Sequence, residues 1–116
     1  MARSAYRLSG EVGNGRRSRL LAHVPERDFL QQVKDLAGFS GWLAYHTLDS
    51  RGSDQGFPDL VLIRGGRVVF AELKSEAGKP SQVQARWLLG LAIAGAEVYL
   101  WRPRNWSQIE AVLSRG

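Results

Sequence analysis

The sequence predicts an α/β fold: a mixed β-sheet with a central hairpin, flanked by helices, in the order αβββαβα. Two observations lead to this prediction. Apolar, β-branched runs on both sides of Gly65-Gly66 are typical of a β-hairpin, because a two-residue turn needs positive φ. Stretches with apolar residues at helical spacing come before and after this hairpin.

The composition is that of one folded domain. The chain has 116 residues, which is enough for one modest core, and 44% of them are hydrophobic. The absence of cysteine excludes a disulfide framework and a thiolate zinc site. No apolar stretch is long enough to span a membrane, and the N-terminus lacks the apolar segment of a secretory signal. We therefore expect an intracellular protein, cytoplasmic in a bacterium or phage-infected cell, or nuclear in a eukaryote.

Charge is unevenly distributed along the chain. Sixteen Lys and Arg against eleven Asp and Glu give a net charge of +5, which mildly favours a polyanionic partner. Residues 1–22 contain five arginines and one glutamate, and three glycines there interrupt regular structure. We expect a basic N-terminal arm over 1–22 and a folded domain over 23–116. The arm is either a loose solvated tail or a segment that lies along DNA or embraces a partner subunit.

The first helix is predicted from Val24 to about Gly38. Pro25 suits its first turn, and an acidic Glu26 complements the positive end of the helix dipole. Glu26 falls on the same side as the apolar stripe, so we expect it on the buried side of the helix tip. There it either only complements the dipole or faces a site as an additional acid. The stripe consists of Phe29, Leu30, Val33, Leu36 and Ala37.

A strand is predicted over 42–47, and a polar loop follows it over 49–57. Leu43, Tyr45 and Thr47 share one face of the strand. His46, on the other face, is either an ordinary hydrogen-bonding residue at a strand end or a contact to a phosphate. The loop is either a plain surface loop or a nucleic-acid contact near a site. Its candidate contact residues are Arg51, Ser53 and Gln55.

The hairpin strands span residues 59–63 and 68–74. If Arg64 pairs with Arg67, Asp59 lies opposite Glu72, with the two Cβ atoms about 4.5–5.5 Å apart. Strand alternation then puts Lys74 on the same face as Glu72. The hairpin therefore brings two carboxylates and an ammonium group together.

Two opposed carboxylates repel each other, and a divalent cation between them removes the repulsion. Mg²⁺ takes oxygen ligands, often one or two carboxylates with several waters. The Leu73 backbone carbonyl is a further candidate ligand if the strand ladder is interrupted there. The alternative is a solvated sheet face on which Lys74 neutralises its neighbours. The apolar residues that flank the acids favour a buried strand over this alternative.

The next predicted helix runs from Ser81 to about Ala94, after a flexible connection over 75–80. Ser81 suits the N-cap, and Gln84 completes a Ser-x-x-Gln capping box. Gln84 also lies on the face that should pack on the sheet. One amide cannot serve fully both as a cap and as a site residue, and the sequence leaves the choice open. The apolar residues of this face are Trp87, Leu88 and Leu91.

The C-terminal part is predicted as a strand followed by a short helix. Gly95 ends the preceding helix, and the strand spans 97–102 before Pro103. The final helix spans 106–113. Its inward residues are Ile109, Val112 and Leu113.

The order Pro58-Asp59, hairpin, Glu72-Leu73-Lys74 resembles the PD-(D/E)-x-K nuclease motif. The fuller pattern resembles a stand-alone, phage-type VRR-NUC domain, a branch of that superfamily found in phage and in replication and repair enzymes. Residues 56–62 resemble its first motif. The resemblance covers about Pro25 to Pro103 and implies a restriction-endonuclease-like core. The second motif is matched by Glu72-Leu73-Lys74-Ser75 followed by Gly78, Ser81, Gln84 and Trp87.

This resemblance implies hydrolysis of DNA phosphodiester bonds by an endonuclease that depends on Mg²⁺ or Mn²⁺. Asp59, Glu72 and the Leu73 carbonyl would hold one metal or two, with Glu26 binding directly or through water. Lys74 would orient the attacking hydroxide or offset developing negative charge. Gln84, or failing that Gln82, would position water or phosphate. The implied catalytic residues are Glu26, Asp59, Glu72, Lys74 and Gln84.

The substrate implied by the resemblance is structured DNA. The motif contains no base-reading element, so we expect recognition of backbone and shape. Holliday junctions, flaps and nicked duplexes in replication, repair or recombination are candidates, and a symmetric junction suggests a homodimer. Expected DNA contacts are Arg51, Ser53 and Lys79. The main alternative is a non-catalytic module that binds nucleic acid or a repair partner; a subunit of a restriction-type assembly is disfavoured by the lack of a target-recognition domain.

Overall fold

The computed structural model describes residues 23–48 and 54–115, and the predicted basic arm over 1–22 lies outside these ranges. The predicted α/β fold and its element order are confirmed, with one short 3₁₀ helix added. None of the helices in the described ranges combines the length and apolarity needed to cross a membrane. The elements are α2 (Glu26–Phe39), β1 (Leu43–His46), β2 (Leu60–Arg64), β3 (Arg67–Leu73), α3 (Gln82–Ile93), β4 (Glu97–Trp101), η1 (Pro103–Asn105) and α4 (Trp106–Ser114).

The four strands form one mixed sheet in the order β1-β2-β3-β4. β2 is antiparallel to both β1 and β3, whereas β4 is parallel to β3. The hairpin register is the predicted one, since Arg64 pairs with Arg67 and Leu60 with Ala71. Of the two turn glycines only Gly65 has positive φ, at 58°. The turn therefore needs glycine at its first central position.

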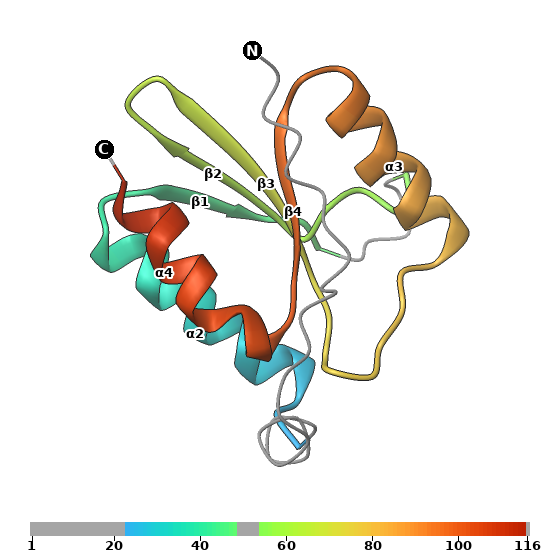
Figure 1. Ribbon diagram of the computed structural model, residues 1–116, viewed down its shortest axis with the longest axis horizontal. Helices are drawn as coiled ribbons and strands as arrows, with labels where there is room; N and C mark the ends of the chain where they lie inside the picture. Colours follow the sequence, from blue (N-terminus) through green and yellow to red (C-terminus); the bar gives the residue numbers. More distant parts are fainter. Residues whose placement is uncertain (1–22, 49–53, 116) are drawn as a thin grey trace.

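Helices cover both faces of the sheet, but not equally. α2 and α4 lie side by side on one face, and α3 lies on the other (Figure 1). On the α2 side, Phe29, Val33 and Ala37 of the predicted stripe are fully buried. The core on the α3 side is smaller and sits over β3 and β4. It consists of Leu88, Ala92 and Val98, with Phe70 and Leu91 partly buried against it.

The turn end of the hairpin is attached to the two helices that share a face. The Arg64 guanidinium donates to the backbone carbonyls of Ser40 and Leu113, at 2.9 and 2.8 Å, where α2 and α4 end. It also lies 4.7 Å from the ring centroid of Trp42. These contacts hold the register at one end of the hairpin. Because side chains alternate strictly along a strand, they also determine which residues meet at the other end.

Over β1 and β2, no helix of the described ranges covers the α3 face of the sheet. Leu43 and Tyr45 of β1 are 73% and 63% exposed. Their direct register partners are Ile63 and Val61 on β2. Ile63 is itself 44% exposed, so apolar side chains form a continuous surface row across neighbouring strands.

Candidate active site

Three polar side chains form a row across β1, β2 and β3 at the end of the hairpin away from its turn. The Thr47 N–H donates to the backbone carbonyl of Asp59 at 2.8 Å, which extends the β1–β2 pairing by one residue. Asp59 directly precedes β2, and Glu72 is the next to last residue of β3. Leu60 and Ala71 are buried in the α2 core, so strand alternation places Asp59 and Glu72 on the α3 face.

The Asp59 carboxylate is held by the backbone of the neighbouring strand. Its Oδ2 atom accepts a hydrogen bond of 2.8 Å from the Leu73 N–H. The backbone ladder between β2 and β3 ends one pair earlier, at Leu60 and Ala71. The N–H and C=O of one strand residue point to the same neighbour in an antiparallel pair, so the Leu73 carbonyl points toward Asp59 as well. The interrupted ladder required for this carbonyl to act as a ligand is therefore present.

Glu72 is a fully buried carboxylate, with 0% of its surface exposed. The Lys74 Nζ lies 3.3 Å from its Oε2, as strand alternation predicted. Its Oε1 accepts no hydrogen bond from any residue within 23–48 or 54–115. The alternative of a solvated face is wrong for this residue. A buried carboxylate oxygen without a hydrogen bond is costly unless a further partner binds it.

The electrostatics of both acids reflect their burial. Burial, and then the nearby Asp59 carboxylate, raise the pKa of Glu72 from 4.5 to about 8, against the opposing effect of Lys74. Burial also raises the pKa of Asp59, while the hydrogen bond from Leu73 works in the opposite direction. Both carboxylates would be stabilised in their charged form by an added positive charge. Perturbed acids of this kind are typical of functional sites.

These donors fit a hard divalent cation. Glu72 Oε1 is buried without a hydrogen-bond partner, Asp59 uses only one oxygen for Leu73, and a backbone carbonyl adjoins them. Among the described residues, no three His, Cys, Asp or Glu side chains come close enough to form a metal cluster. Two carboxylates are nevertheless sufficient for Mg²⁺, which keeps several waters.

Glu26 lies near the two acids but not on the buried side of its helix. Its side chain is solvent-exposed, which corrects the expected burial, because Pro25 is the N-cap and Glu26 is the first residue of α2. The Glu26 charge still contributes to the raised pKa of Asp59 and of Glu72. Glu26 and Asp59 line one cavity of about 380 Å³. Glu26 therefore lies near the acid pair without forming a three-carboxylate cluster with it in the described part of the chain.

Gln84 lines the same cavity and also caps α3. Its side-chain oxygen accepts from the Ser81 N–H at 2.9 Å, and the Ser81 hydroxyl accepts from the Gln84 N–H at 3.1 Å. The predicted capping box is confirmed. The amide oxygen is used by the cap, which leaves the amide nitrogen for the cavity. The fallback residue Gln82 is exposed and is not among the residues that line this cavity.

Of the remaining predicted contacts, Gln55 lines the cavity with Asp59. Arg51 and Ser53 lie outside the described residues, so their role stays a prediction. Lys79 is described and is exposed in the connection between β3 and α3. His46 pairs with Leu60, and its side chain lies on the sheet face opposite Asp59. It nevertheless lies close enough to lower the pKa of Asp59 slightly, so neither of its two predicted roles is excluded.

The connection over 75–80 is held in place, although the sequence predicted a flexible segment. The Arg102 guanidinium donates to the backbone carbonyls of Ser75, at 2.7 Å, and of Gly78. The Arg104 N–H donates to the Glu76 carboxylate at 2.7 Å. Basic residues that directly follow β4 thus fix the segment that follows Lys74. Sequence reasoning missed this role because the partners lie more than 20 residues away and those of Arg102 are backbone carbonyls.

Thr47 was also missed as a site residue. Its hydroxyl is buried and has no hydrogen-bond partner among the described residues. It lines the cavity with Asp59 and is the residue paired with it on β1. Extending the predicted register to β1 would have identified it.

Comparison with known proteins gives one family. The family model described as the VRR-NUC domain matches residues 14–105, most of the chain. Searches of curated proteins and of solved structures return no match.

Proposed function

The chain belongs to the VRR-NUC domain family, a nuclease-type domain, and on that premise we propose that it is a metal-dependent DNA endonuclease. The observation that supports the metal-dependent chemistry is the buried Glu72 carboxylate. Neither of its oxygens accepts a hydrogen bond from the described residues, the carboxylate lies beside Asp59, and the Lys74 ammonium forms an ion pair with it at 3.3 Å. Such an acid is destabilised when charged, and a divalent cation would stabilise it.

In this proposal Asp59, Glu72 and the Leu73 carbonyl hold Mg²⁺ or Mn²⁺. The bound cation would supply positive charge that stabilises the phosphate oxygens and lowers the pKa of an attacking water. Asp59 contributes a carboxylate whose orientation is set by the Leu73 N–H. Glu26, which lines the same cavity as Asp59, would bind the cation through water.

Lys74 and Gln84 act on the substrate rather than on the cation. The Lys74 ammonium carries three donors and lies at the edge of the acid pair, where it orients the nucleophile or offsets charge on the phosphate. The Gln84 amide nitrogen would donate to the phosphate or to the attacking water, since the amide oxygen already accepts a hydrogen bond from Ser81. Lys74 directly follows β3, and the segment after it is held by the hydrogen bond from Arg102 to Ser75.

The proposed substrate is structured DNA, such as a Holliday junction, a flap or a nicked duplex, in replication, repair or recombination. The net charge of +5 supports binding to the phosphate backbone. Lys79, exposed in the connection between β3 and α3, is the proposed residue for such a contact. Recognition through backbone and shape then places the cut relative to a branch rather than to a base sequence.

We also propose that two copies of the chain act together. α3 does not cover the apolar row on β1 and β2. This row includes Leu43, Tyr45 and Ile63. A flat apolar sheet face of this kind is typical of an interaction surface. A second copy would cover it and would present two sites to a symmetric junction.

The test is cleavage of labelled duplex, flap and four-way-junction DNA in Mg²⁺ or Mn²⁺, with EDTA as the metal-free control. Lys74→Ala should lower cleavage at least about a hundredfold, because it removes a charge at the reacting phosphate. Lys34→Ala, which removes a lysine two turns along α2 from Glu26, is the matched control and should leave cleavage unchanged. If the wild type binds DNA in every form but cuts none, the chain is a binding module and the proposal is wrong.

A further inference from the structure

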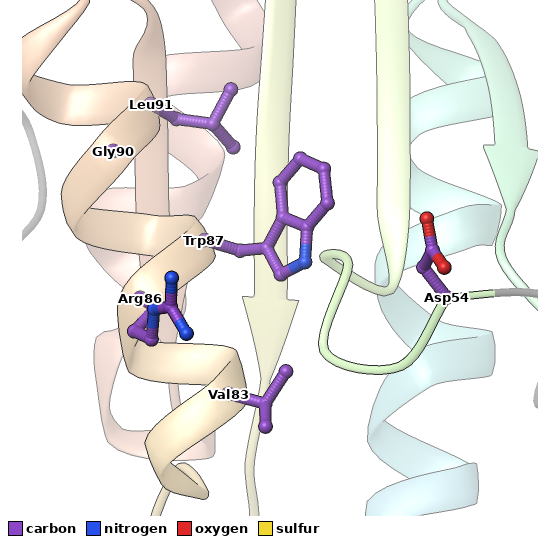
Figure 2. Close-up of a pocket in the computed structure, with 6 residues that line it drawn as sticks. All are labelled: Asp54, Val83, Arg86, Trp87, Gly90 and Leu91. Carbon is purple, nitrogen blue, oxygen red and sulfur yellow. The ribbon is translucent and has the colours of Figure 1, made fainter.

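A second pocket adjoins the cavity that Glu26 and Asp59 line, which is called the acidic cavity below. It has a volume of about 510 Å³, within the range of pockets that hold small ligands. Asp54 and Val83 line both this pocket and the acidic cavity, so the two are neighbours. Figure 2 shows its lining residues. They are Asp54, Val83, Arg86, Trp87, Gly90 and Leu91.

The main aromatic surface in this pocket is the indole of Trp87. In Figure 2, Val83, Trp87 and Leu91 extend from α3 toward β3, one helical turn apart from each other. The Phe57 ring packs against the indole edge-to-face, with centroids 5.1 Å apart and an interplanar angle of 80°. Even so, 37% of Trp87 stays exposed. The pocket therefore contains an aromatic ring that Phe57 keeps in position and that still exposes part of its surface to a ligand.

The wall opposite α3 is held close to the helix. Gly56 has φ +92°, and a Cβ built on it would lie 2.8 Å from the Val83 backbone carbon. Only glycine allows this approach, so the segment that carries Asp54 and Phe57 is pressed against the start of α3. The pocket is therefore a feature of close packing and not a gap between loosely placed segments.

Charged groups at the pocket match a nucleotide. Arg86 is exposed on α3 beside Trp87, and its guanidinium suits a phosphate. Asp54 offers carboxylate oxygens that can accept from the amino group of a base. In single strands, proteins recognise the phosphate, the flat face of the base and the edge of the base. Arg86, Trp87 and Asp54 offer one partner for each of these.

We propose that this pocket receives one unstacked base of the DNA strand that is cut, with the base on Trp87 and a neighbouring phosphate on Arg86. This inference rests on the proposed function, because the acidic site has to hold the adjacent phosphate. A base inside a duplex is stacked and paired, so it cannot enter. The pocket therefore selects substrates that carry an unpaired nucleotide next to the cut, as in a flap or an opened junction.

The test uses binding in EDTA, where no cleavage occurs. A labelled flap oligonucleotide is prepared with its base intact and with an abasic site at each position in turn around the branch. Wild type should bind the intact flap about tenfold more tightly than the abasic flap at one position. Trp87→Leu should remove this difference, whereas Trp87→Phe keeps an aromatic ring and should retain most of it. Thermal melting checks that each variant is folded.

Two further variants separate the contribution of the phosphate contact from that of the base contact. Arg86→Gln should weaken binding of intact and abasic flaps by the same factor, because it acts on the phosphate. Leu89→Ala, an exposed change on α3 outside both pockets, should alter neither. The proposal is overturned if no position shows a base effect in the wild type, or if Trp87→Leu retains that effect.

Failure of this inference can be distinguished from failure of the proposed function. If cleavage requires metal and Lys74 but no position shows a base effect, only the pocket proposal is wrong. If the base effect depends on Trp87 but no metal supports cleavage, the pocket is a binding site and the hydrolytic function is wrong.

Discussion

The carboxylate of Asp59 accepts a hydrogen bond of 2.8 Å from the backbone N–H of Leu73, across the open end of the β2–β3 hairpin. This bond replaces the next rung of the strand ladder. It orients the carboxylate while leaving its second oxygen available. Asp59 thus has a structural role and a proposed ligand role at the same time.

Asparagine and alanine at position 59 should separate these two roles. Asp59→Asn keeps an oxygen that accepts from Leu73 and also removes repulsion with Glu72, so its free energy of unfolding should match or exceed that of the wild type. Asp59→Ala should lose about 1 kcal/mol, because the Leu73 N–H loses its partner. Both should lose metal-dependent cleavage. Thermal unfolding beside a cleavage assay makes the comparison, and equal stability of the two variants would contradict the role of the hydrogen bond.

The raised pKa of Glu72 should make the stability of the metal-free protein depend on pH. The folded pKa is about 8 and the ordinary value is 4.5. An acid whose pKa is raised by folding contributes stability that is fully present below pH 4.5 and is lost as pH rises through 8. Glu72→Gln removes this loss, so the variant should gain on the wild type between pH 5 and 9. A difference of about 1 kcal/mol moves the melting temperature by roughly 4–8 °C.

Melting curves in EDTA across this pH range provide the measurement. Glu110→Gln, which alters an exposed acid on α4, is the matched control and should follow the wild type. Parallel curves for the wild type and Glu72→Gln would show that the buried carboxylate does not titrate in this range.

Metal affinity should rise with pH up to about pH 8. A cation must displace the proton that Glu72 carries below that pH, so each pH unit should strengthen binding by up to about tenfold. Titration calorimetry with Mn²⁺ in buffers of different ionisation enthalpy measures both affinity and proton release. Lys74→Met should move the midpoint to higher pH, because Lys74 lowers the pKa of Glu72. Affinity independent of pH would exclude Glu72 as a ligand.

The capping box allows the structural role of Gln84 to be measured separately. Ser81→Ala and Gln84→Ala each break one half of the box and should each cost about 0.5–2 kcal/mol. Only Gln84 offers an amide nitrogen to the site, so Gln84→Ala should lower cleavage more than Ser81→Ala at matched stability. Equal cleavage by the two variants would leave Gln84 with the capping role alone.

The exposed apolar row on β1 and β2 should control the oligomeric state. In size-exclusion chromatography with light scattering, the wild type at micromolar concentration should be a dimer. Leu43→Glu should be a monomer whose circular dichroism spectrum is unchanged. Phe39→Glu replaces a side chain that is 92% exposed at the end of α2, the helix on the opposite face of the sheet, and should leave the dimer intact. A monomeric wild type would contradict the proposal.

The fold and the acid pair were predictable from local rules. Periodicity indicated each helix, and a two-residue turn leaves only one register, which placed Asp59 and Glu72 on one face with Lys74. The Ser81–Gln84 box was likewise readable from spacing, because both partners lie within one helical turn.

The parts that were not predictable depend on contacts between distant segments. The exposure of Glu26 depends on where α2 begins, because Glu26 is the first residue after the N-cap Pro25 and lies beyond the buried part of the stripe. Arg102 holds the segment after Lys74 through backbone carbonyls, which carry no sequence signal. The Trp87 pocket exists because Gly56 lets a loop approach α3. The sequence by itself therefore determined the elements, the hairpin register and the pair of acids, since these follow from short-range periodicity. Only the tertiary structure decided how the segment after Lys74 is held and where the neighbouring pocket lies, since each results from packing of segments far apart in the chain.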